Sequence, residues 1–563
     1  MARTVAIGIQ NFSELIEKNC FYIDKTMFIK EWWESNDNTT LITRPRRFGK
    51  TLNMSMLEYF FSNKYAGRGD LFEGLAIWQE EEYRVLQGTY PVIALSFARM
   101  KEVDCASCKE KVMEIVQNLY SDFAFIKGSE VLSDSDRLFF EKILLGDASD
   151  AVLTSSLHQL SRFLYLYYGK KVIILLDEYD TPMQEAYVGG YWQGLVQFIR
   201  SLFNATFKTN PYLERAVMTG ITRVSKESIF SDLNHLEVVT TTTNKYTTAF
   251  GFTEDEVFAA LDEAGLSGEK AEVKQWYDGF LFGEQKDIYN PWSIINFIDK
   301  KEYGTYWANT SANSLVGKLL REGNRDIKEA FETLLKGESI DTPLDEQIVY
   351  NQLDNNEAAV WSLLLATGYL KVLGRQVGPQ YGSKRKYTLA LTNYETKCMF
   401  EGMVTDWFGR VTSDYNGFIK AMLADDIEVM NAYMNRVAFA SFSYFDTGAG
   451  RLRAEPERFY HGFVLGLLVE LQEEYMITSN RESGFGRYDV MIEPKEPAKR
   501  DAIIIEFKVR NERKEATLEE TVQAALKQIE EKQYAAQLIA RGIPVERIRS
   551  YGFAFQGKEV LIG

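Results

Sequence analysis

The residues whose types and spacing most clearly suggest chemistry are the eight from Arg44 to Thr51, Arg-Pro-Arg-Arg-Phe-Gly-Lys-Thr. They follow a strand-like stretch, Leu41-Ile42-Thr43, and precede a helix-forming stretch, Leu52 to Phe61. A Gly-Lys-Thr turn between a strand and a helix suits phosphate, because the amides at the helix start point at the anion. Lys50 would add a point charge and Thr51 would offer a hydroxyl to Mg²⁺.

An acidic pair further along the chain supplies the complementary half of this chemistry. The apolar run Val172 to Leu176 ends in Asp177 and Glu178. At the end of a buried parallel strand, Asp177 would hold the metal through its water shell and Glu178 would orient the attacking water. Either half alone is a common accident. Together they predict ATP hydrolysis, with ATP and Mg²⁺ as cofactors.

The loop departs from the usual pattern at Arg44, which stands where a phosphate loop normally has its first glycine. A side chain with a Cβ restricts the backbone there, because glycine is the residue that readily takes a positive φ. The insert Pro45-Arg46-Arg47 is also unusually basic for a loop that binds phosphate through backbone amides. The candidate nucleotide contacts are Arg46, Arg47, Phe48, Gly49, Lys50 and Thr51. The alternative interpretation is a strand, a surface arginine cluster and a helix N-terminus.

The first half of the chain alternates short apolar runs with longer helical patterns. The candidate strands are Thr39 to Thr43, Val92 to Phe97, Val172 to Leu176 and Ala216 to Thr222, and the helical stretches include Lys109 to Phe123 and Ala151 to Tyr168. This alternation predicts a mostly parallel sheet covered on both faces. After the last strand, Thr222 or Arg223 could contact the γ-phosphate, or the segment could be a well-packed strand end.

Length and composition limit the class of protein. A chain of 563 residues predicts two to four domains. No stretch approaches the roughly eighteen apolar residues that span a bilayer, and the first residues lack the apolar core of a secretion signal. The four cysteines are too few for a disulfide framework, and one Cys105-Ala106-Ser107-Cys108 pair with three histidines argues against structural zinc. We expect a reduced, cytoplasmic protein without a membrane partner.

The net charge of -16 argues against a globally basic nucleic-acid binder. It leaves room for a local basic groove, because affinity for phosphates depends on the few lysines and arginines that reach the backbone.

From about Phe252 the sequence becomes helical, with aromatic landmarks. They are Trp276 to Phe280, Tyr289 to Ser293 and Tyr306 to Thr310. Aromatic residues at such spacings are more often core than binding site. Further helices are predicted over Leu319 to Leu335 and Trp361 to Leu373, as parts of an all-α or winged module.

The tail contains a second group of residues suited to chemistry. Asp489 begins an apolar run, and Ala502 to Val509 reads Ala-Ile-Ile-Ile-Glu-Phe-Lys-Val. If the two runs pair as a hairpin, Asp489 meets Glu506, and period-two alternation puts Glu506 and Lys508 on one face. Two converging carboxylates make a site for Mg²⁺, with Mn²⁺ as a second candidate ion. Lys508 could then position or deprotonate a water that attacks a phosphodiester.

The residues around this pair leave one alternative open. Glu506 and Lys508 alone would be an ordinary solvated i, i+2 pair on an edge strand. Asp489 on the preceding strand favours the metal site. In the helix expected over Leu518 to Gln537, Gln528 and Tyr534 could face nucleic acid or orient the site.

Taken together, these motifs resemble a known family, the AAA-ATPase-like proteins with a C-terminal PD-(D/E)XK nuclease domain, found in many anaerobic bacteria. The similarity runs through Tyr22 to Thr26, Arg44 to Thr51, Leu175 to Asp180, Thr219 to Arg223, Trp276 to Phe280, Tyr289 to Ser293, Gly368 to Leu370, Arg487 to Asp489 and Glu506 to Lys508. It implies an α/β fold: a P-loop AAA-like ATPase domain with a parallel sheet over 1–285, a helical or winged middle region over 286–455, and a restriction-endonuclease-like domain over 456–563. An arginine at position 44 looks typical of the family.

The resemblance also implies roles for individual residues. Lys50 and Thr51 would contact nucleotide and Mg²⁺, and Asp177 and Glu178 would form the acidic pair. In the tail, the implied nuclease core is Asp489, Glu506 and Lys508, with Gln528 as the helix glutamine and Glu470 as the first-helix acidic residue. Tyr488 stands before Asp489 where the family name has proline.

Two functions follow from these expectations. The first is an ATP-binding and ATP-hydrolysing protein coupled to metal-dependent cleavage of nucleic acid, with DNA favoured, acting in defence against foreign DNA. The second is a nucleotide-dependent switch whose nuclease-fold tail only binds a partner. The trio Asp489, Glu506 and Lys508 favours the first, because a pure binding module has no need for it. Homo-oligomerisation is left open.

Overall fold

A computed structural model describes residues 3–563 except for a set of short gaps, at 224–229, 231–232, 234, 309–312, 323–324, 345–352, 354–355, 377–385, 408–411, 446–454, 480–481, 484–485, 488, 512–513 and 557–558. Of the sequence landmarks, Asn309, Thr310 and Tyr488 lie outside the described residues. The chain packs as two compact units, Met1–Ser311 with Ser339–Thr396, and Ala312–Glu338 with Lys397–Gly563. The three-part division expected from the sequence stays a prediction.

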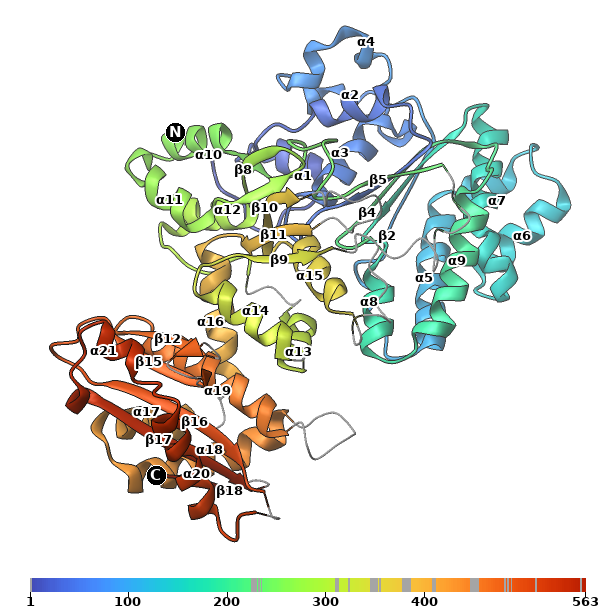
Figure 1. Cartoon of the computed structure of the whole chain (residues 1–563). Helices are drawn as coiled ribbons and strands as arrows, with labels where there is room; N and C mark the ends of the chain where they lie inside the picture. The colour runs from blue at the N-terminus through green and yellow to red at the C-terminus, as the bar shows by residue number, and fades with distance from the viewer. Residues whose placement is uncertain are drawn as a thin grey trace. The chain divides into compact units, whose positions relative to one another are not determined.

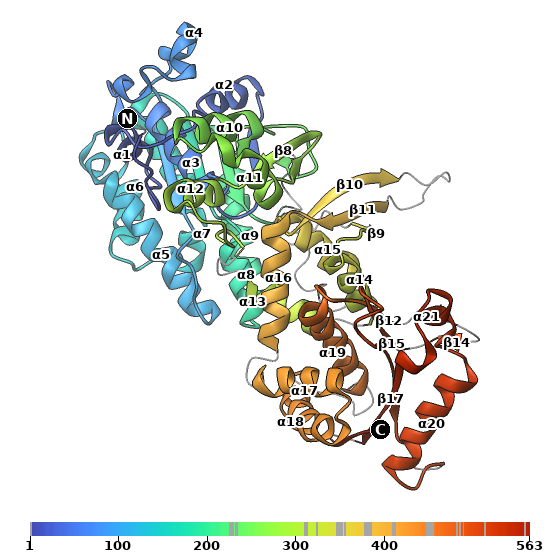
Figure 2. The ribbon, with the colours of Figure 1, turned by 90° about the vertical axis from the view of Figure 1, so that its left-hand side faces the viewer.

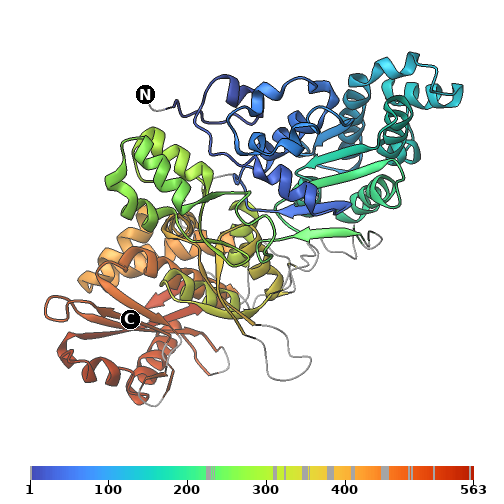
Figure 3. The same cartoon turned by 90° about the horizontal axis from the view of Figure 1, so that it is seen from above.

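A parallel sheet forms the core of the first unit. Its strand order is β2-β3-β4-β1-β5, with bounds Val92–Ser96, Val172–Asp177, Leu213–Gly220, Thr39–Thr43 and Leu236–Val239. The strands lie side by side in Figure 3. β1 and β3 are buried along their whole length, as strands covered on both faces must be. The expected α/β class is confirmed.

Helices cover both faces of this sheet (Figure 1). On one side lies α3 (Lys50–Phe61), and on the other lie α5 (Cys105–Asp122), α7 (Asp150–Tyr168) and α9 (Trp192–Phe207). β4 separates β1 from β3 in the sheet. The loops that follow these three strands therefore meet at one edge, the carboxyl edge, where open α/β sheets bind ligands.

Smaller elements complete the first unit. They are two three-stranded sheets, β6-β8-β7 (Phe252–Thr253, Gln285–Tyr289, Phe280–Phe282) and β10-β11-β9 (Leu370–Gln376, Lys386–Leu391, Ile340–Pro343), and the helices α10 (Glu254–Glu263), α11 (Lys270–Tyr277), α12 (Pro291–Lys300) and α15 (Glu357–Ala366). α16 (Tyr394–Trp407) begins in this unit and continues into the second.

Two expected helices differ from the structure. The stretch Trp361 to Leu373 is helical only to Ala366, and Leu370 already belongs to β10. Gly368 takes a φ of +89°, which ends the helix and turns the chain into the strand. Leu319 to Leu335 is divided between α13 (Asn313–Glu322) and α14 (Arg325–Leu335).

The second unit is built on a five-stranded mixed sheet of order β12-β15-β16-β17-β18, with bounds Tyr475–Ser479, Val490–Pro494, Ala502–Val509, Ile548–Gln556 and Glu559–Ile562. Figure 2 shows α20 (Leu518–Glu531) and α21 (Ala536–Ala540) on one side of the sheet. α18 (Ile427–Phe445) and α19 (Glu455–Leu471) lie on the other, and α17 (Thr412–Ala424) packs against α18. The helix expected over Leu518 to Gln537 is thus α20 and the start of α21.

Candidate functional site

The phosphate loop joins the end of β1 to the start of α3. Gly49 takes a φ of +78°, a left-handed conformation that a residue with a Cβ would adopt only under strain. The buried Lys50 ammonium donates to the carbonyl oxygens of Arg44 at 2.9 Å and Pro45 at 2.8 Å. Burial lowers the pKa of Lys50, against the opposing charges of Glu178, Asp177 and Asp180. The lysine is therefore held inside the loop, and its contact with nucleotide stays a prediction.

Asp177, the last residue of β3, meets the start of α3. Its Oδ2 accepts from Thr51 Oγ1 at 2.7 Å, and its Oδ1 accepts from the hydroxyl of Thr219 on β4. Burial raises the pKa of Asp177, and the two hydroxyls and Lys50 oppose that rise. A hydroxyl and a carboxylate oxygen this close form a donor set that suits Mg²⁺. The order β3-β4-β1 brings them together across β4.

Glu178 follows directly in a left-handed conformation, with a φ of 51°. A glutamate with a positive φ is uncommon, and such strain often accompanies a functional site. Its Oε2 accepts from Thr181 Oγ1 at 3.2 Å, and the side chain is half-buried. Its amide donates to the Thr219 hydroxyl at 3.4 Å, so Glu178 and Asp177 lie together at the same strand end and both contact Thr219.

Asp180 is a buried residue that the sequence reasoning assigned no role. Its Oδ2 accepts from the amides of Ile221 at 3.0 Å and Thr222 at 2.8 Å, and from Thr222 Oγ1 at 2.7 Å. Thr222 is buried and bonded to Asp180, which fits the interpretation of a well-packed strand end. Arg223 is half-buried at the end of the same segment. The signal in the sequence was a third acid three residues after Asp177.

Arg44 has no exposed surface. Its guanidinium donates to the carbonyl oxygens of Thr43, Thr240, Lys245 and Tyr246 at 2.8 to 3.3 Å, and lies 4.5 Å from the ring centroid of Phe282. Burial lowers its pKa to about 9. The alternative of a surface arginine cluster is therefore wrong for Arg44, which ties the loop to residues 240–246.

The other residues of the phosphate loop differ in exposure. Phe48 is buried and packs edge-on against Phe280 at 4.8 Å between ring centroids. Arg46 is half-buried, and its carbonyl oxygen accepts from Asn290 Nδ2 at 3.2 Å. Arg47 is exposed and lies 4.3 Å from the ring centroid of Trp292. Of the loop side chains, that of Phe48 is thus packed into the protein, and a nucleotide contact by this residue stays a prediction.

In the tail, the expected hairpin is confirmed. β15 pairs antiparallel with β16, with Val490 opposite Ile505, which places Asp489 beside Glu506. Asp489 Oδ2 accepts from the Phe507 amide at 2.8 Å. Phe507 points to the opposite face, where its ring packs against Phe463 of α19 at 5.7 Å.

Gln528 of α20 connects the two polar residues of β16. Its Oε1 accepts from Lys508 Nζ at 2.7 Å, and its Nε2 donates to Glu506 Oε1 and to the Tyr534 hydroxyl, the latter at 3.1 Å. Glu506 and Lys508 therefore share the face of the sheet that α20 covers, which excludes a solvated edge pair. The structure brings together all four tail residues expected at the site, Asp489, Glu506, Lys508 and Gln528.

The Glu506 carboxyl group lies in surroundings that disfavour its charged form. It is 4% exposed, and its Oε2 has no hydrogen-bond partner among the described residues. Burial, reinforced by the charge of Asp489, raises its pKa to about 8. A buried carboxylate oxygen without a donor is costly unless a proton or a cation compensates it. Together with Asp489 it is a fitting oxygen pair for Mg²⁺ or Mn²⁺.

Two parts of the chain match families of known proteins. Residues 6–230 match a family model described as "Predicted AAA-ATPase", and residues 455–563 match the PD-(D/E)XK nuclease superfamily. The chain therefore contains an AAA-ATPase-like domain over residues 6–230 and a PD-(D/E)XK nuclease superfamily domain over residues 455–563. A curated relative, "Uncharacterized protein in vnfD 5'region" of Azotobacter chroococcum mcd 1, is 24% identical over 96% of this chain and 95% of its own length.

The first-helix acidic residue of the nuclease superfamily domain stays a prediction. Glu470 lies near the end of α19 and is exposed. Burial raises the pKa of Tyr415, and the charge of Glu470 adds to that rise. Within the described part of the chain, no helix is long and apolar enough to cross a membrane.

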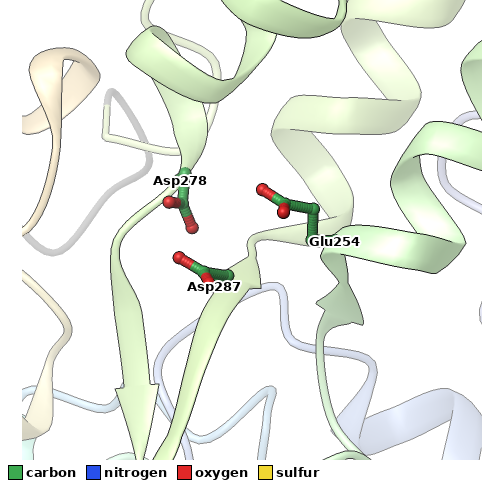
Figure 4. A group of neighbouring side chains, drawn as sticks. All are labelled: Glu254, Asp278 and Asp287. Atoms are coloured by element: carbon green, nitrogen blue, oxygen red, sulfur yellow. The ribbon is translucent and has the colours of Figure 1, made fainter.

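The first unit contains another acidic group, formed by Glu254, Asp278 and Asp287 (Figure 4). Their carboxylate oxygens lie within 4.8 Å of one another. The Lys274 ammonium pairs with Glu254 and lies 3.8 Å from Asp287. Burial, reinforced by a hydrogen bond with Asp287, raises the pKa of Asp278 to about 7. The Lys274 ammonium thus balances part of the negative charge of this group.

Proposed function

We propose that this protein is an ATP-regulated nuclease. ATP is bound and hydrolysed at the phosphate loop of the first unit, and the nucleotide governs metal-dependent cleavage of nucleic acid by the tail. The observation that carries the proposal is the unpartnered, buried Oε2 of Glu506 beside Asp489, with Lys508 held next to it by Gln528. A domain that only binds a partner has no use for a buried charge that must be compensated.

At the first site, Lys50 would exchange the carbonyls of Arg44 and Pro45 for the β- and γ-phosphate oxygens. Thr51 and Asp177 would hold Mg²⁺, which neutralises charge on the transferred phosphoryl group when it is bound. Glu178 would orient the attacking water, and its half-buried side chain directly after Asp177 at the strand end supports this role. Arg46, Arg47 and Arg223 remain candidate phosphate contacts.

At the second site, Asp489 and Glu506 would hold Mg²⁺ or Mn²⁺, which supplies Lewis-acid stabilisation of the phosphodiester when bound. Lys508 orients a water or accepts its proton, and Gln528 fixes the ammonium of Lys508 in position. DNA is the favoured substrate, and a role in defence against foreign DNA fits that substrate. We place this activity in the cytoplasm and leave homo-oligomerisation open.

The deciding experiment measures cleavage of plasmid, linear and single-stranded DNA with Mg²⁺ or Mn²⁺, with and without ATP. Wild type is compared with Glu178→Gln and Lys508→Ala. Glu178→Gln should bind ATP and hydrolyse it about 10²-fold or more slowly, because it lacks the group that activates water. The matched control is Lys527→Ala, an exposed lysine on α20.

Two outcomes would count against the proposal. If wild type cleaves nothing with any metal or nucleotide, the tail is a binding module and the nucleotide-dependent switch becomes the better account. If Glu178→Gln abolishes ATP binding, the division of roles between Asp177 and Glu178 is wrong.

A further inference from the structure

The outer side of the phosphate loop is covered by another part of the first unit. Pro45 lies so close to Gly368 that a Cβ at position 368 would be 2.9 Å from the proline ring. Phe48 packs against Phe280, and Arg47 lies over Trp292. The loop is therefore packed against residues of the β6-β8-β7 sheet, α12 and the turn before β10. Because this packing is close, a change in the conformation of the loop must displace those residues.

Asn290 connects the loop to the start of α12. It is 1% exposed, and its Nδ2 donates to the Arg46 carbonyl oxygen at 3.2 Å. Its Oδ1 accepts from the Trp292 amide at 2.9 Å, which caps the helix. One amide side chain thus fixes both a loop carbonyl and the first turn of α12.

Ser293 and Glu395 continue this connection to α16. Both are fully buried, and Ser293 Oγ donates to Glu395 Oε2 at 2.8 Å. Glu395 Oε1 accepts from the amides of Trp307 at 2.6 Å and Ala308 at 3.3 Å. A buried carboxyl group with three donors is stable only while they stay in place, since each donor left unpaired costs about 1–3 kcal/mol. Such a network favours discrete arrangements over gradual deformation.

Glu395 is the second residue of α16, the helix that leaves the first unit after Thr396. The residue before the helix, Asn393, accepts from the Thr396 amide at 3.0 Å and donates to the Tyr277 carbonyl oxygen at 3.1 Å. The first turn of α16 is thus anchored in the unit that holds the phosphate loop, and the remainder of the helix leads into the second unit.

We propose that Ser293 and Glu395 are positioning residues that couple the phosphate loop to the first turn of α16. A nucleotide that draws Lys50 away from the loop carbonyls changes the conformation of residues 45–48, and Asn290, Ser293 and Glu395 carry that change to the helix. The inference rests on the proposed nucleotide binding at the loop. Through these residues the nucleotide state would regulate the tail. A path of this kind is established by measuring the coupling between its two ends.

The test is hydrogen exchange of residues 394–407 in the full chain, with and without Mg²⁺ and a non-hydrolysable ATP analogue, beside a separate measurement of analogue affinity. In wild type the analogue should change the exchange rates of this helix about 5-fold or more, the lower range of allosteric coupling. Ser293→Ala should keep analogue affinity within about 3-fold of wild type while the response of 394–407 falls below about 2-fold. Ser293→Thr, which keeps the hydroxyl, should retain the response.

Ser161→Ala is the matched control, because Ser161 is also fully buried in the first unit and its hydroxyl donates to Leu157 O at 2.7 Å within α7. It should respond as wild type does. If Ser293→Ala does not fold, Ser293→Cys replaces it, because a thiol fills the same space and is a weak donor. The same loss of response is expected.

The outcomes separate the two proposals. Analogue binding without a response in 394–407 overturns the coupling and leaves the proposed function intact. A full response in Ser293→Ala or Ser293→Cys also overturns it. Absence of analogue binding in wild type overturns the nucleotide half of the proposed function, and the coupling falls with it.

Discussion

At the phosphate loop, Lys50, Asp177 and Asp180 each have hydrogen-bond partners within the first unit, whereas in the tail Glu506 has one oxygen with no partner among the described residues. The first site compensates its buried charges by carbonyls, hydroxyls and amides of its own fold. The second leaves a carboxylate to be compensated by a proton or a cation. A site of the first kind stays organised by itself, while one of the second kind depends on what binds there.

The largest expected effect tests the tail. Glu506→Ala and Asp489→Ala should abolish cleavage, because each removes a metal ligand, while ATP binding in the first unit survives. Lys508→Ala should reduce cleavage about 10²- to 10⁴-fold and leave metal affinity nearly unchanged, because lysine handles the water and is not a ligand. Metal titration beside a nuclease assay separates these cases. Cleavage at the wild-type rate by Lys508→Ala would show that the catalytic site lies elsewhere.

A smaller loss, in binding alone, is expected at the phosphate loop. Lys50→Ala should weaken ATP binding about 100-fold or more, because it removes charge-assisted contacts to the phosphates. Binding of a fluorescent ATP analogue measures this, with circular dichroism to verify the fold. Lys64→Ala, an exposed lysine just after α3, is the control. Unchanged affinity in Lys50→Ala contradicts the assignment of the loop.

The stability of the first unit should depend more on Arg44 than on Arg47, another arginine of the same loop. Arg44→Gly, which restores the usual glycine, should lower the free energy of unfolding of the first unit by roughly 3 kcal/mol or more, because it leaves several buried carbonyls unpartnered. Arg47→Gly is the matched control, since Arg47 is exposed with a φ of 65°, where glycine is unstrained. Urea unfolding of both variants tests this. Equal midpoints would refute a clamping role for Arg44.

The smallest effect concerns the pH dependence of stability in the first unit. Burial raises the pKa of Glu395 to about 7 from an ordinary 4.5, so the folded state binds its proton more tightly than the unfolded state does. The contribution of Glu395 to the free energy of unfolding is fully present below about pH 4.5 and is lost as the pH rises through about 7. The raised pKa contributes roughly 3 kcal/mol at most to the free energy of unfolding.

Glu395→Gln should remove this dependence, since glutamine does not titrate. Urea midpoints of wild type and variant should converge towards about pH 5 and diverge towards about pH 8, with wild type losing more stability. Asp278 and Glu506 titrate in both proteins, so their contributions cancel when the stability of the variant is subtracted from that of wild type. Parallel pH profiles would mean that Glu395 keeps an ordinary pKa in the folded state.

Much of the molecule follows from local signals in the sequence. The strand Thr39 to Thr43 was expected with its observed bounds, because a short apolar run before a glycine-lysine turn has few other conformations. The pairing of Asp489 with Glu506 also followed from the alternation along two adjacent runs, because a hairpin joins segments that are neighbours in the chain. The chemistry of both sites lies in such contiguous segments.

What the tertiary structure decided are the contacts between distant segments. No pattern near Arg44 shows that its guanidinium lies among carbonyls of residues 240–246, or that Asp180 holds the end of β4. The bond between Ser293 and Glu395 joins residues 102 positions apart. Local periodicity reports which face of an element is buried, but the partner that a buried polar group finds depends on how strands order in the sheet and how helices pack around it. For this reason the sequence determined where chemistry could occur, and only the folded chain decided what supports and connects those places.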